Sequence, residues 1–525
     1  MEGTLAWPLE QAARTHGAAP AVVDGERELT YRELHRRSGG LGAALSRLGL
    51  ERGAVVAVLA GNTLAHLECW HALPAHGFVI NALNYRLATP ELAFMLDDSR
   101  AALLLVDRER LEVGRELRRR CDSLQHLVYT DWDEAPPDCL AYEDLVDASP
   151  VPAPDLPSHT LAAISYTGGT TGRPKGVMLS HLNLLANAKH NTMEAGFWPS
   201  DRYLHSAPMF HVADISQLYG ITWAGGTHVM IRRFDARDVV AAVARYRLTF
   251  LIFVPTMLRL FLQELLERPV DLSSLRAVIY AAAPISTELQ RWAMEVLPCD
   301  VIQGYGMTEA APSLCFLTAE DHRRAAAGEE PFTRRLGSVG RPARGVQLQI
   351  CDSDDRPLPP GEIGEICARG PNIMLGYWNR PDETAAALRG GWYHTGDAGY
   401  ADEYGYVFLV DRLKDMIVTG GENVYSIEVE RALLAHPAVA EAAVFAIPDR
   451  RWGEAVHAVV TLADGAQLEE TDLVEHCRTL IAGYKLPRSL ELRRAPLPKS
   501  GAGKVLKHEL RAPYWAGRDR GVAGS

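Results

Sequence analysis

Three features of the sequence predict an α/β fold with largely parallel sheet. Along the 525 residues, short β-branched or apolar runs alternate with longer amphipathic stretches, which is typical of layered α/β proteins. Hydrophobic residues make up 47% and charged residues 23% of the chain, ordinary values for a globular protein. No internal repeat of fixed period is present. At about 150 residues per domain, this length predicts roughly three to four domains.

The apolar runs predict where each element lies. Strands are expected at 54–60, 101–107, 161–165, 250–254, 277–281, 443–447 and 455–462. Helices are expected at 30–48, 236–246, 287–297 and 426–434, and the third should begin with a capping box from Thr287 to Gln290. The Pro-rich segment 149–159 is interpreted as a surface linker. A charged stretch at 411–415 precedes a fresh α/β pattern, so we place a domain boundary near residue 412.

The charge balance excludes a general nucleic-acid-binding protein. The net charge is −12, from 54 Lys and Arg against 66 Asp and Glu, whereas affinity for nucleic acid depends on neutralising phosphates. The segment 485–525 differs, because it holds ten Lys and Arg against three Asp and Glu. This basic tail is either a solvated surface or a face that meets a polyanionic ligand.

Cysteine usage and the ends of the chain favour a cytoplasmic protein. The eight cysteines are scattered without a C-x-x-C pair, and their spacing predicts neither a disulfide framework nor a zinc site. The first residues lack a signal-peptide pattern, and the last three are not a peroxisomal signal. Apolar runs are too short for a transmembrane helix, which leaves peripheral membrane contact open. Whether the protein is a monomer or a homodimer is also left open.

The run from Tyr166 to Gly176 predicts a phosphate-binding loop. It follows a short apolar strand and combines four glycines, three threonines and a lysine. Glycines let several backbone N–H groups converge on one anion, and hydroxyls and an ammonium add donors. The spacing is neither that of a Walker A loop nor that of a dinucleotide fingerprint. The alternative is a surface turn. The candidate phosphate ligands are Thr167, Gly168, Gly169, Thr170, Thr171, Gly172 and Lys175.

Segment 167–176 resembles the phosphate-loop signature of the adenylate-forming superfamily, which comprises acyl-CoA synthetases, peptide-synthetase adenylation domains and beetle luciferases. Gly168 stands where that signature usually has a small hydroxyl residue. Further motifs of the superfamily follow in its order. They are Pro208-Met-Phe-His211, Ala281-Ala-Ala-Pro284, Gln303-Gly-Tyr-Gly-Met-Thr-Glu309, Thr395-Gly-Asp397, the stretch 411–423 and Pro498-Lys-Ser-Gly-Ala-Gly-Lys504.

The resemblance implies roles for the residues around the nucleotide. Tyr305 would stack on adenine, which Ala282, Ala283 and Pro284 would border. Thr308 would bond a phosphate oxygen, and Glu309 would hold Mg²⁺, a hard cation that favours carboxylate and phosphate oxygens. Asp397 would accept hydrogen bonds from the ribose hydroxyls. His211 would gate the carboxylate of the substrate, and a histidine there argues against an amino-acid substrate.

The resemblance also implies roles in the second part of the chain. Lys504 would reach into the active site, and Lys414 would lie at a hinge. Arg412 would contact the ribose or the α-phosphate. The expected contacts to CoA are Gly420, Gly421, Trp452 and Arg488.

The implied fold is a large composite N-terminal domain of stacked α/β subdomains, residues 1–412, joined by the hinge to a small, mobile α+β C-terminal domain, residues 413–525. The implied activity is ATP-dependent: a carboxylic acid is adenylated and then transferred to CoA. Small residues after His211 and around 281–307 favour a medium- or long-chain fatty acid. Aryl or arylpropenoic acids, a carrier-protein acceptor and a non-catalytic nucleotide sensor are the alternatives.

Overall fold

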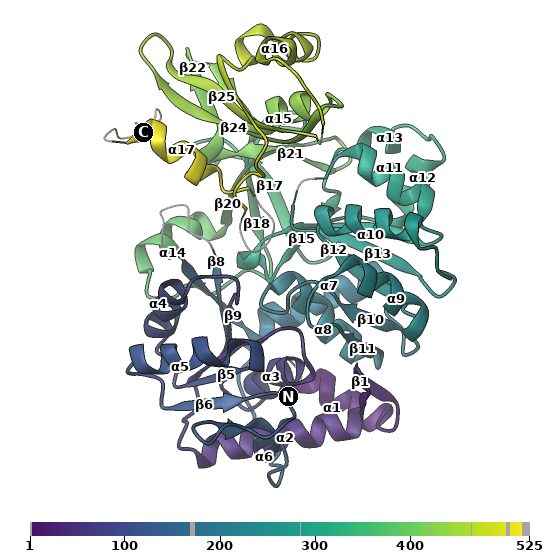
Figure 1. The fold of residues 1–525 in the computed structure, drawn as a ribbon, viewed down its shortest axis with the longest axis vertical. Helices are drawn as coiled ribbons and strands as arrows, with labels where there is room; N and C mark the ends of the chain where they lie inside the picture. The colour runs from purple at the N-terminus through teal and green to yellow at the C-terminus, as the bar shows by residue number, and fades with distance from the viewer. Residues whose placement is uncertain are drawn as a thin grey trace. The chain divides into compact units, whose positions relative to one another are not determined.

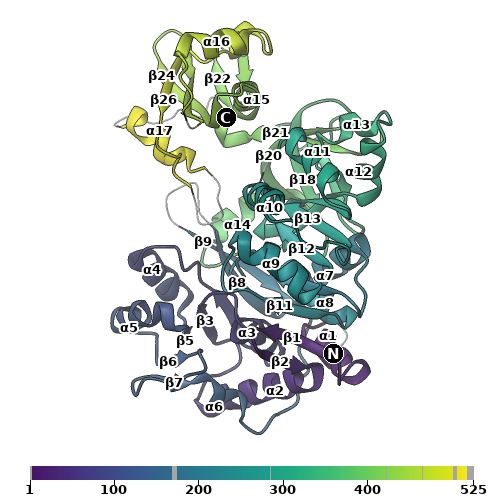
Figure 2. The same ribbon diagram turned by 45° about the vertical axis from the view of Figure 1, so that its right-hand side comes forward.

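A computed structural model describes residues 3–167, 174–283, 285–420, 422–463, 465–499 and 505–516. The chain forms two compact units (Figures 1 and 2). Unit 1 comprises Met1–Leu348 and Ala368–Tyr393, and unit 2 comprises Gln349–Cys367 and His394–Ser525. The predicted boundary between domains 1–412 and 413–525 marks the part of the chain that is expected to move, and it stays a prediction.

Unit 1 contains two large sheets. The eight-stranded sheet has the order β19 (Gly376–Tyr377), β9 (Lys175–Ser180), β8 (Leu161–Thr167), β4 (Val79–Ala82), β3 (Val55–Leu59), β5 (Leu103–Val106), β6 (His126–Tyr129) and β7 (Leu140–Ala141). It is parallel from β8 to β7, whereas β19 and β9 run antiparallel to their neighbours.

The nine-stranded sheet has the order β16 (Arg341–Pro342), β15 (Ser313–Leu317), β14 (Asp300–Gly306), β13 (Ala277–Ala281), β12 (Phe250–Phe253), β10 (Arg202–His205), β11 (Thr227–Met230), β1 (Pro20–Asp24) and β2 (Arg27–Thr30). Its strands from β14 to β1 are parallel, and antiparallel strands close both edges. The predicted largely parallel sheet is therefore confirmed in unit 1.

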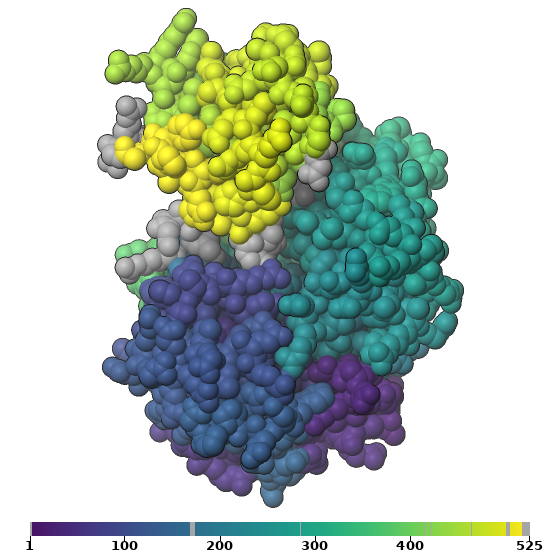
Figure 3. Space-filling view, in the orientation of Figure 1, coloured from purple at the N-terminus to yellow at the C-terminus, as the bar shows by residue number. Residues whose placement is uncertain are grey.

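Helices separate and cover the two sheets. The inner layer consists of α1 (Ala6–Thr15), α2 (Tyr31–Arg47), α3 (Leu64–Ala75), α7 (His181–Ala195) and α8 (Val212–Ala224), whose apolar faces share one core with strands of both sheets. Helices α4 (Thr89–Ser99) and α5 (Leu111–Arg120) cover the outer face of the eight-stranded sheet, and α9 (Ala236–Tyr246), α10 (Pro255–Glu267) and α11 (Thr287–Val296) cover that of the nine-stranded sheet. Figure 3 shows the blue and teal parts of unit 1 packed against each other.

Strand β3 shows how the sequence specifies these layers. Val56 and Val58 belong to the inner core, whereas Val55, Ala57 and Leu59 face the outer core. Side chains alternate between the faces of a strand, so a strand buried on both faces is apolar throughout. The smaller elements of unit 1 are η1 (Arg108–Arg110), α6 (Tyr142–Val146), η2 (Thr308–Ala310), α12 (Ala319–Ala326), α13 (Phe332–Arg335), α14 (Pro381–Ala387) and η3 (Arg389–Gly391).

Unit 2 departs from the parallel sheet that the alternation of elements predicts, but it agrees with the α+β domain that the resemblance implies. One sheet consists of β17 (Gln347–Cys351), β18 (Gly364–Arg369), β20 (Tyr393–Ala401) and β21 (Val407–Arg412), and β20 pairs antiparallel to β21. The other joins β22 (Ile417–Thr419), β23 (Glu422–Val424), β24 (Val439–Asp449), β25 (Gly453–Leu462) and β26 (Ser489–Arg493), and only the β25–β26 pair is parallel. The remaining elements are η4 (Leu413–Asp415), α15 (Ser426–Leu434), α16 (Glu470–Arg478), η5 (Gly483–Lys485) and α17 (Lys507–Trp515).

Most predicted elements are confirmed to within a few residues. The helix predicted at 30–48 is α2, which begins with a capping box between Thr30 and Glu33. The capping box predicted from Thr287 to Gln290 is wrong. The N-cap of α11 is Ser286, whose hydroxyl accepts the Leu289 N–H. Ser286 directly precedes the first helical residue, Thr287, and an N-cap side chain acts from that position.

A buried ion pair joins α2 to α3. The Arg37 guanidinium donates to both carboxylate oxygens of Glu68, with N–O distances of 2.5 and 3.0 Å, and also to Glu143 at 2.9 Å. The Tyr142 hydroxyl donates to the same Glu68 carboxylate at 3.1 Å. Glu68 is fully buried and Arg37 is 6% exposed. The pair thus fixes α2 against α3, with hydrogen bonds to both oxygens of the Glu68 carboxylate.

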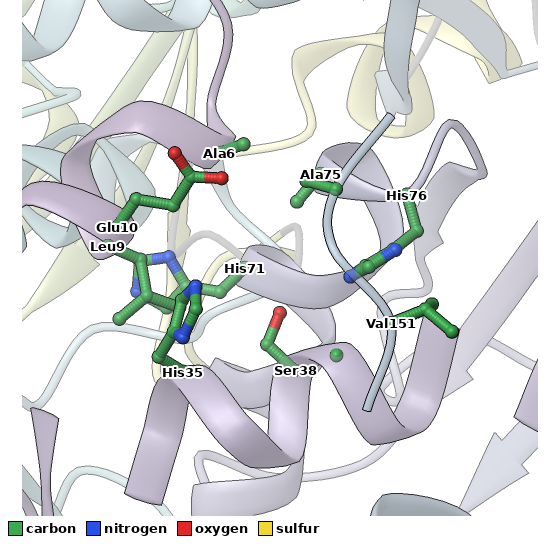
Figure 4. Close-up of a pocket in the computed structure, with 11 residues that line it drawn as sticks. Ala6, Leu9, Glu10, His35, Ser38, His71, Ala75, His76 and Val151 are labelled. Atoms are coloured by element: carbon green, nitrogen blue, oxygen red, sulfur yellow. The ribbon is translucent and has the colours of Figure 1, made fainter. Parts of the chain in front are cut away.

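A small cavity of ≈ 20 Å³ lies near α1, α2 and α3, which is about the space of one water molecule. Figure 4 shows Glu10, His35, Ser38 and His71 around it. None of the predicted site residues lines this cavity. The cavity is therefore not the predicted nucleotide site.

Buried histidines make unit 1 sensitive to acid. Burial lowers the pKa of His71 to about 3 and the pKa values of His66, His76, His181 and His190 to about 4. The pKa of a histidine in the unfolded chain is about 6.5, so the unfolded state binds more protons between these values. Each of the five should therefore remove about 1.4 kcal/mol of stability per pH unit as the pH falls from about 6.5 to 4.

Urea unfolding of His190→Asn at pH 7, 6 and 5 measures this slope for one residue. We expect the slope to fall by about 1.4 kcal/mol per pH unit relative to the natural chain. The exposed His159 supplies the matched control, His159→Asn, which should keep the original slope. An unchanged slope in His190→Asn would show that its burial does not control titration.

Candidate active site

The predicted phosphate loop closes a hairpin between β8 and β9. Thr167 pairs with Lys175, and Tyr166 pairs with Gly176, so the two ends of the loop are held by strand register. Gly176 packs tightly, because an added Cβ would lie 2.8 Å from the Ile164 side chain. The candidate residues Gly168, Gly169, Thr170, Thr171 and Gly172 lie outside the described residues.

Tyr377 joins Lys175 to Glu309. The Lys175 ammonium lies 5.2 Å from the centre of the Tyr377 ring and forms an ion pair with Glu383. The Tyr377 hydroxyl donates to Glu309 Oε1 at 3.0 Å. Burial, followed by the charge of Glu309, raises the pKa of this phenol, so it remains a donor. A cation, a carboxylate and the phosphate hairpin therefore meet at one ring.

The adenine and magnesium motifs lie at the carboxyl end of two neighbouring parallel strands. Ala281 ends β13 and pairs with Gly304 in β14, so the small-residue loop after β13 begins beside Tyr305, near the end of β14. Ala282 adopts a φ of +70°, which is strained for a residue with a side chain. In open α/β sheets ligands bind at such carboxyl edges. Ala283 belongs to the same turn, and Pro284 lies outside the described residues.

Close backbone packing fixes the turn that presents Thr308 and Glu309. A Cβ on Gly306 would lie 1.8 Å from the Pro312 carbonyl oxygen, so only glycine fits. The Glu309 carbonyl accepts the Met374 N–H at 2.8 Å. The Glu309 carboxylate is partly exposed. A carboxylate with one oxygen held by Tyr377, beside a lysine and a phosphate loop, fits Mg²⁺ bound to triphosphate.

Asn62 holds the segment that carries His211. Its amide group donates to the carbonyls of His205 and Ala207 at 2.9 and 2.8 Å, and its carbonyl accepts the Met209 N–H at 2.9 Å. His211 then forms the N-cap of α8, and its ring lies 4.5 Å from that of Phe210. Sequence reasoning missed Asn62. Its one signal is a polar side chain three residues after the end of the fully buried strand β3.

Asp214, three residues after His211, has its hydrogen-bond partners within the protein. Its carboxylate accepts hydrogen bonds from the Tyr203 hydroxyl at 3.0 Å and from His205 Nδ1 at 2.5 Å. His205 Nε2 continues to His228 Nδ1 at 2.9 Å. Thr222 Oγ1 then bridges His228 Nε2 at 2.9 Å and His71 Nε2 at 3.1 Å. This chain of buried groups, which we call the histidine chain, supplies the buried Asp214 carboxyl group with hydrogen-bond partners inside the core.

In unit 2, Asp397 and Arg412 form a pair on the β20–β21 hairpin. Their Cα positions are in register, and Arg412 Nε lies 2.5 Å from Asp397 Oδ1. The turn before Asp397 is held by Glu365, whose Oε1 accepts the Gly396 N–H at 3.0 Å. Gly396 has a φ of +69°, which favours glycine. Glu365 was missed, because nothing in its local sequence marks a partner 31 residues away.

The predicted hinge follows a buried hydrogen-bond cluster. Asp411 accepts hydrogen bonds from the backbone and side chain of Ser426, and Lys507 Nζ donates to the same serine at 2.6 Å. Burial raises the pKa of Asp411, and the charge of Lys507 opposes this shift. Lys414 lies in η4, directly after this cluster. The cluster ties the end of β21 to α15 and α17, which follow Lys414 in the chain, so a rotation about Lys414 would have to break the hydrogen bonds between Asp411 and Ser426.

Two guanidinium groups lie close to the Trp452 ring. The guanidinium carbons of Arg451 and Arg488 are 4.7 and 4.6 Å from the centre of its ring. Gly420 has a φ of +62°, and an added Cβ would lie 2.6 Å from the indole, so the backbone approaches the ring closely. The predicted CoA residues Gly420, Trp452 and Arg488 thus form one cluster. Gly421 lies outside the described residues.

Lys504 also lies outside the described residues, but the base of its segment is described. Lys499 and Val505 form an antiparallel bridge, and the Leu506 N–H donates to the Pro498 carbonyl at 2.8 Å. Glu441 accepts the Leu497 N–H at 3.0 Å and forms an ion pair with Lys499. The segment is thereby closed at a defined point of unit 2.

Removing the Tyr377 hydroxyl should weaken magnesium use. In Tyr377→Phe the ring beside Lys175 remains, but Glu309 loses its 3.0 Å hydrogen bond. We expect the Mg²⁺ concentration for half-maximal AMP formation to rise by about tenfold or more, since a hydrogen bond to a charged group contributes about 1.5–3 kcal/mol. A Mg²⁺ titration at saturating ATP measures this. Tyr400→Phe, in unit 2, is the control, and equal Mg²⁺ curves for both variants would contradict the role of Tyr377.

Known proteins match nearly the whole chain. The AMP-binding enzyme family model matches residues 9–378, and the model of the AMP-binding enzyme C-terminal domain matches residues 428–504. A feruloyl-CoA synthase of Amycolatopsis sp. is 40% identical, over 98% of this chain and 99% of its own length. The fatty acid–[acyl-carrier-protein] ligase ScoC of Streptomyces coeruleorubidus is 36% identical, over 99% and 98% of the two chains.

Solved structures share the fold. The o-succinylbenzoate CoA synthetase MenE of Bacillus subtilis, in complex with its acyl-adenylate intermediate, has a TM-score of 0.83 and 30% identity, with 96% of this chain and 97% of that chain covered. Of the helices formed by the described residues, none is long and apolar enough to cross a bilayer. The chain belongs to the AMP-binding enzyme family of the adenylate-forming superfamily, and it is an acid–thiol ligase of the AMP-forming class.

Proposed function

We propose that this protein adenylates an arylpropenoic acid with ATP and transfers the acyl group to CoA. The observation that carries the adenylation step is the meeting of the phosphate hairpin, Lys175 and Glu309 at the Tyr377 ring. A triphosphate with its cation needs these three kinds of group at one place. The tandem match to both AMP-binding family models supports the same reaction.

In the first half-reaction the substrate carboxylate attacks the α-phosphate, and pyrophosphate leaves. Both reactants are anions, so the barrier is largely electrostatic, and fixed positive groups lower it. Lys175 and the loop N–H groups would hold the phosphates, and Lys504 would offset charge at the reacting oxygens. Glu309 would hold Mg²⁺, which neutralises phosphate charge when bound. Asp397 would orient the ribose, and Tyr305 with the turn at Ala282 would hold adenine.

In the second half-reaction the thiol of CoA displaces AMP from the acyl carbon. The cluster of Arg451, Trp452 and Arg488 supports a site for the nucleotide end of CoA, since guanidinium groups bind phosphates and an indole stacks on a base. Gly420, packed on the same indole, would let the pantetheine arm pass close to the backbone.

The choice of an aromatic acid rests on the relatives. The feruloyl-CoA synthase at 40% identity over nearly the whole chain favours this substrate class. Aromatic rings near the His211 segment agree with it, because Tyr85 packs edge-on against Phe210 at 5.0 Å. A medium- or long-chain fatty acid, expected from the small residues of the sequence, is the second candidate. The relative named as a fatty acid ligase, 36% identical, favours it.

A release assay separates these candidates. AMP formation is measured with ferulate, benzoate, octanoate and palmitate, each with and without CoA. We expect CoA-dependent AMP release to be fastest with ferulate. A faster rate with octanoate or palmitate would replace the aromatic acid by the fatty acid. Acyl-adenylate that accumulates equally with and without CoA would point to another acceptor, such as a carrier protein.

We also propose that residues 413–525 rotate about Lys414 between the two half-reactions. Lys414→Pro should restrict φ at this position and lower overall turnover by about tenfold or more, while one half-reaction survives. Each half-reaction is measured alone, with ATP and acid or with premade acyl-AMP and CoA. Lys189→Ala, on the exposed side of α7, is the control for general damage. Unchanged overall turnover in Lys414→Pro would contradict the rotation.

A further inference from the structure

Three residues of unit 2 bring different metal-binding atoms together. Glu365 and Cys367 lie on β18, and His394 lies on β20. His394 Nδ1 is 2.8 Å from Glu365 Oε2 and 3.3 Å from Cys367 Sγ. The carboxylate, thiol and imidazole atoms all lie within 4.8 Å of one another. Alternate residues of one strand face the same side of a sheet, which is why Glu365 and Cys367 reach the same histidine.

The set of donors fits a particular kind of cation. Thiolate and imidazole bind Zn²⁺ and other borderline-soft ions, and a carboxylate completes many such sites. With Zn–S near 2.3 Å and Zn–N near 2.0 Å, tetrahedral ligand atoms are about 3.5 Å apart. The observed separation of Sγ and Nδ1, 3.3 Å, is close to this value. The glutamate needs to move outward by well under an ångström.

A second carboxylate lies beside these three residues. Asp355 Oδ1 is 3.9 Å from His394 Nδ1, and the Asp355 side chain is 39% exposed. The Cys367 side chain is fully buried, and that of His394 is 4% exposed. The site therefore has a buried soft side and an exposed carboxylate side through which a hydrated ion can approach.

We propose that Glu365, Cys367 and His394, with Asp355, bind Zn²⁺ and that its binding inhibits adenylation. On binding, the Cys367 thiol releases its proton to solvent, and the proton of the imidazole is held on Nε2 while Nδ1 ligates the ion. The inhibition follows from a shared residue. Glu365 also accepts the Gly396 N–H at 3.0 Å, and Gly396 precedes Asp397. A metal that pulls on Glu365 therefore displaces the turn that presents Asp397.

Cysteine spacing alone does not predict this site. The ligands come from two strands and a loop, so they lack the short repeated spacing of a structural zinc motif. The inhibition rests on the proposed adenylation, whereas the binding does not.

The binding test compares the natural chain with Cys367→Ser and Cys351→Ser at pH 7.5. Cys351 is a buried cysteine on β17 of the same sheet and lies outside the ligand set. After equilibrium dialysis with Zn²⁺ alone, we expect the natural chain and Cys351→Ser to hold one more ion per chain than Cys367→Ser. Loss of a ligand should weaken affinity by at least about tenfold. Equal Zn²⁺ content in all three proteins would overturn the site.

A spectroscopic measurement on the natural chain guards against misfolding of the variant. With Co²⁺ in place of Zn²⁺, a thiolate ligand gives a charge-transfer absorption in the near ultraviolet. Its absence would also overturn the site.

The inhibition test measures acyl-adenylate formation with excess Mg²⁺ and increasing Zn²⁺. We expect the natural chain and Cys351→Ser to be inhibited at Zn²⁺ concentrations at least tenfold below those needed for Cys367→Ser. Equal inhibition of all three would overturn the regulatory role. Absence of adenylation from every protein before Zn²⁺ is added would instead refute the proposed function, while the dialysis result would still decide the binding site.

Discussion

Lys504→Ala should slow acyl-adenylate formation by about a hundredfold or more, because it removes a positioned positive group that offsets charge in the transition state. Thioester formation from premade acyl-AMP and CoA should stay near the rate of the natural chain. The two half-reactions are measured separately, by pyrophosphate release with ATP and acid, and by thioester formation. The second rate also reports whether the variant is folded.

Lys499→Ala is the matched control for Lys504. It removes the same charge from the same segment, but the Lys499 ammonium is paired with Glu441 at the base. We expect adenylation to fall by less than about tenfold, the range of a partly exposed ion pair. Adenylation that survives in Lys504→Ala would show that the lysine has another role. Equal losses in both variants would show that net charge, rather than position, matters.

Arg37→Met should lower the free energy of unfolding of unit 1 by about 3–5 kcal/mol, the usual loss when one partner of a buried ion pair is removed. Glu68 is fully buried and would keep only its hydrogen bond from Tyr142. The neighbouring exposed pair supplies the control, since Arg36 Nη2 lies 3.0 Å from Asp147 Oδ1 at the surface. Arg36→Met should change stability by less than about 1 kcal/mol. Urea unfolding followed by fluorescence measures both.

The sign of the pH dependence identifies the mechanism. Burial already raises the pKa of Glu68 above its ordinary value of 4.5, and loss of Arg37 should raise it further. A carboxyl group with a raised pKa in the folded state costs stability above its unfolded pKa, and this cost fades as the pH falls. The difference in the free energy of unfolding between Arg37→Met and the natural chain should therefore be smaller at pH 5. If this difference is equal at pH 5 and pH 7.5, lost packing, not an unpaired charge, destabilises the variant.

Signals from residues that are close together in the sequence account for the elements and site residues that the sequence predicts correctly. Helix α9 is found at its predicted residues, because Asp235 caps it and one apolar face meets the core. The phosphate loop, the β14 turn and the Asp397 turn are each continuous in sequence, so their residues could be listed before their positions were known. Tyr377, Glu383 and Asn62 could not be found in this way. Each acts on a partner far away in the chain, and such partners depend on how the sheets stack.

The strand direction in unit 2 shows the same limit. Apolar runs at 443–447 and 455–462 were recognised as strands, but they form the long antiparallel pair of β24 and β25. A short link favours an antiparallel hairpin, and the connection Arg450–Trp452 between these strands is too short for a crossover helix. Loop length was therefore the better guide to direction than alternation with helices.

The hydrogen bonds of the histidine chain beyond His205 can all point in either of two opposite directions. With one proton on His205, at Nδ1, each bond points toward Asp214, and Thr222 accepts from His71. A second proton on His205 reverses every bond beyond it, and Thr222 then donates to His71. Burial lowers the pKa values of His71 and His228, so both rings stay neutral in either arrangement and only exchange tautomers. A single proton beside Asp214 of α8 thus determines which nitrogen of His71 is protonated, on α3 and next to the small cavity.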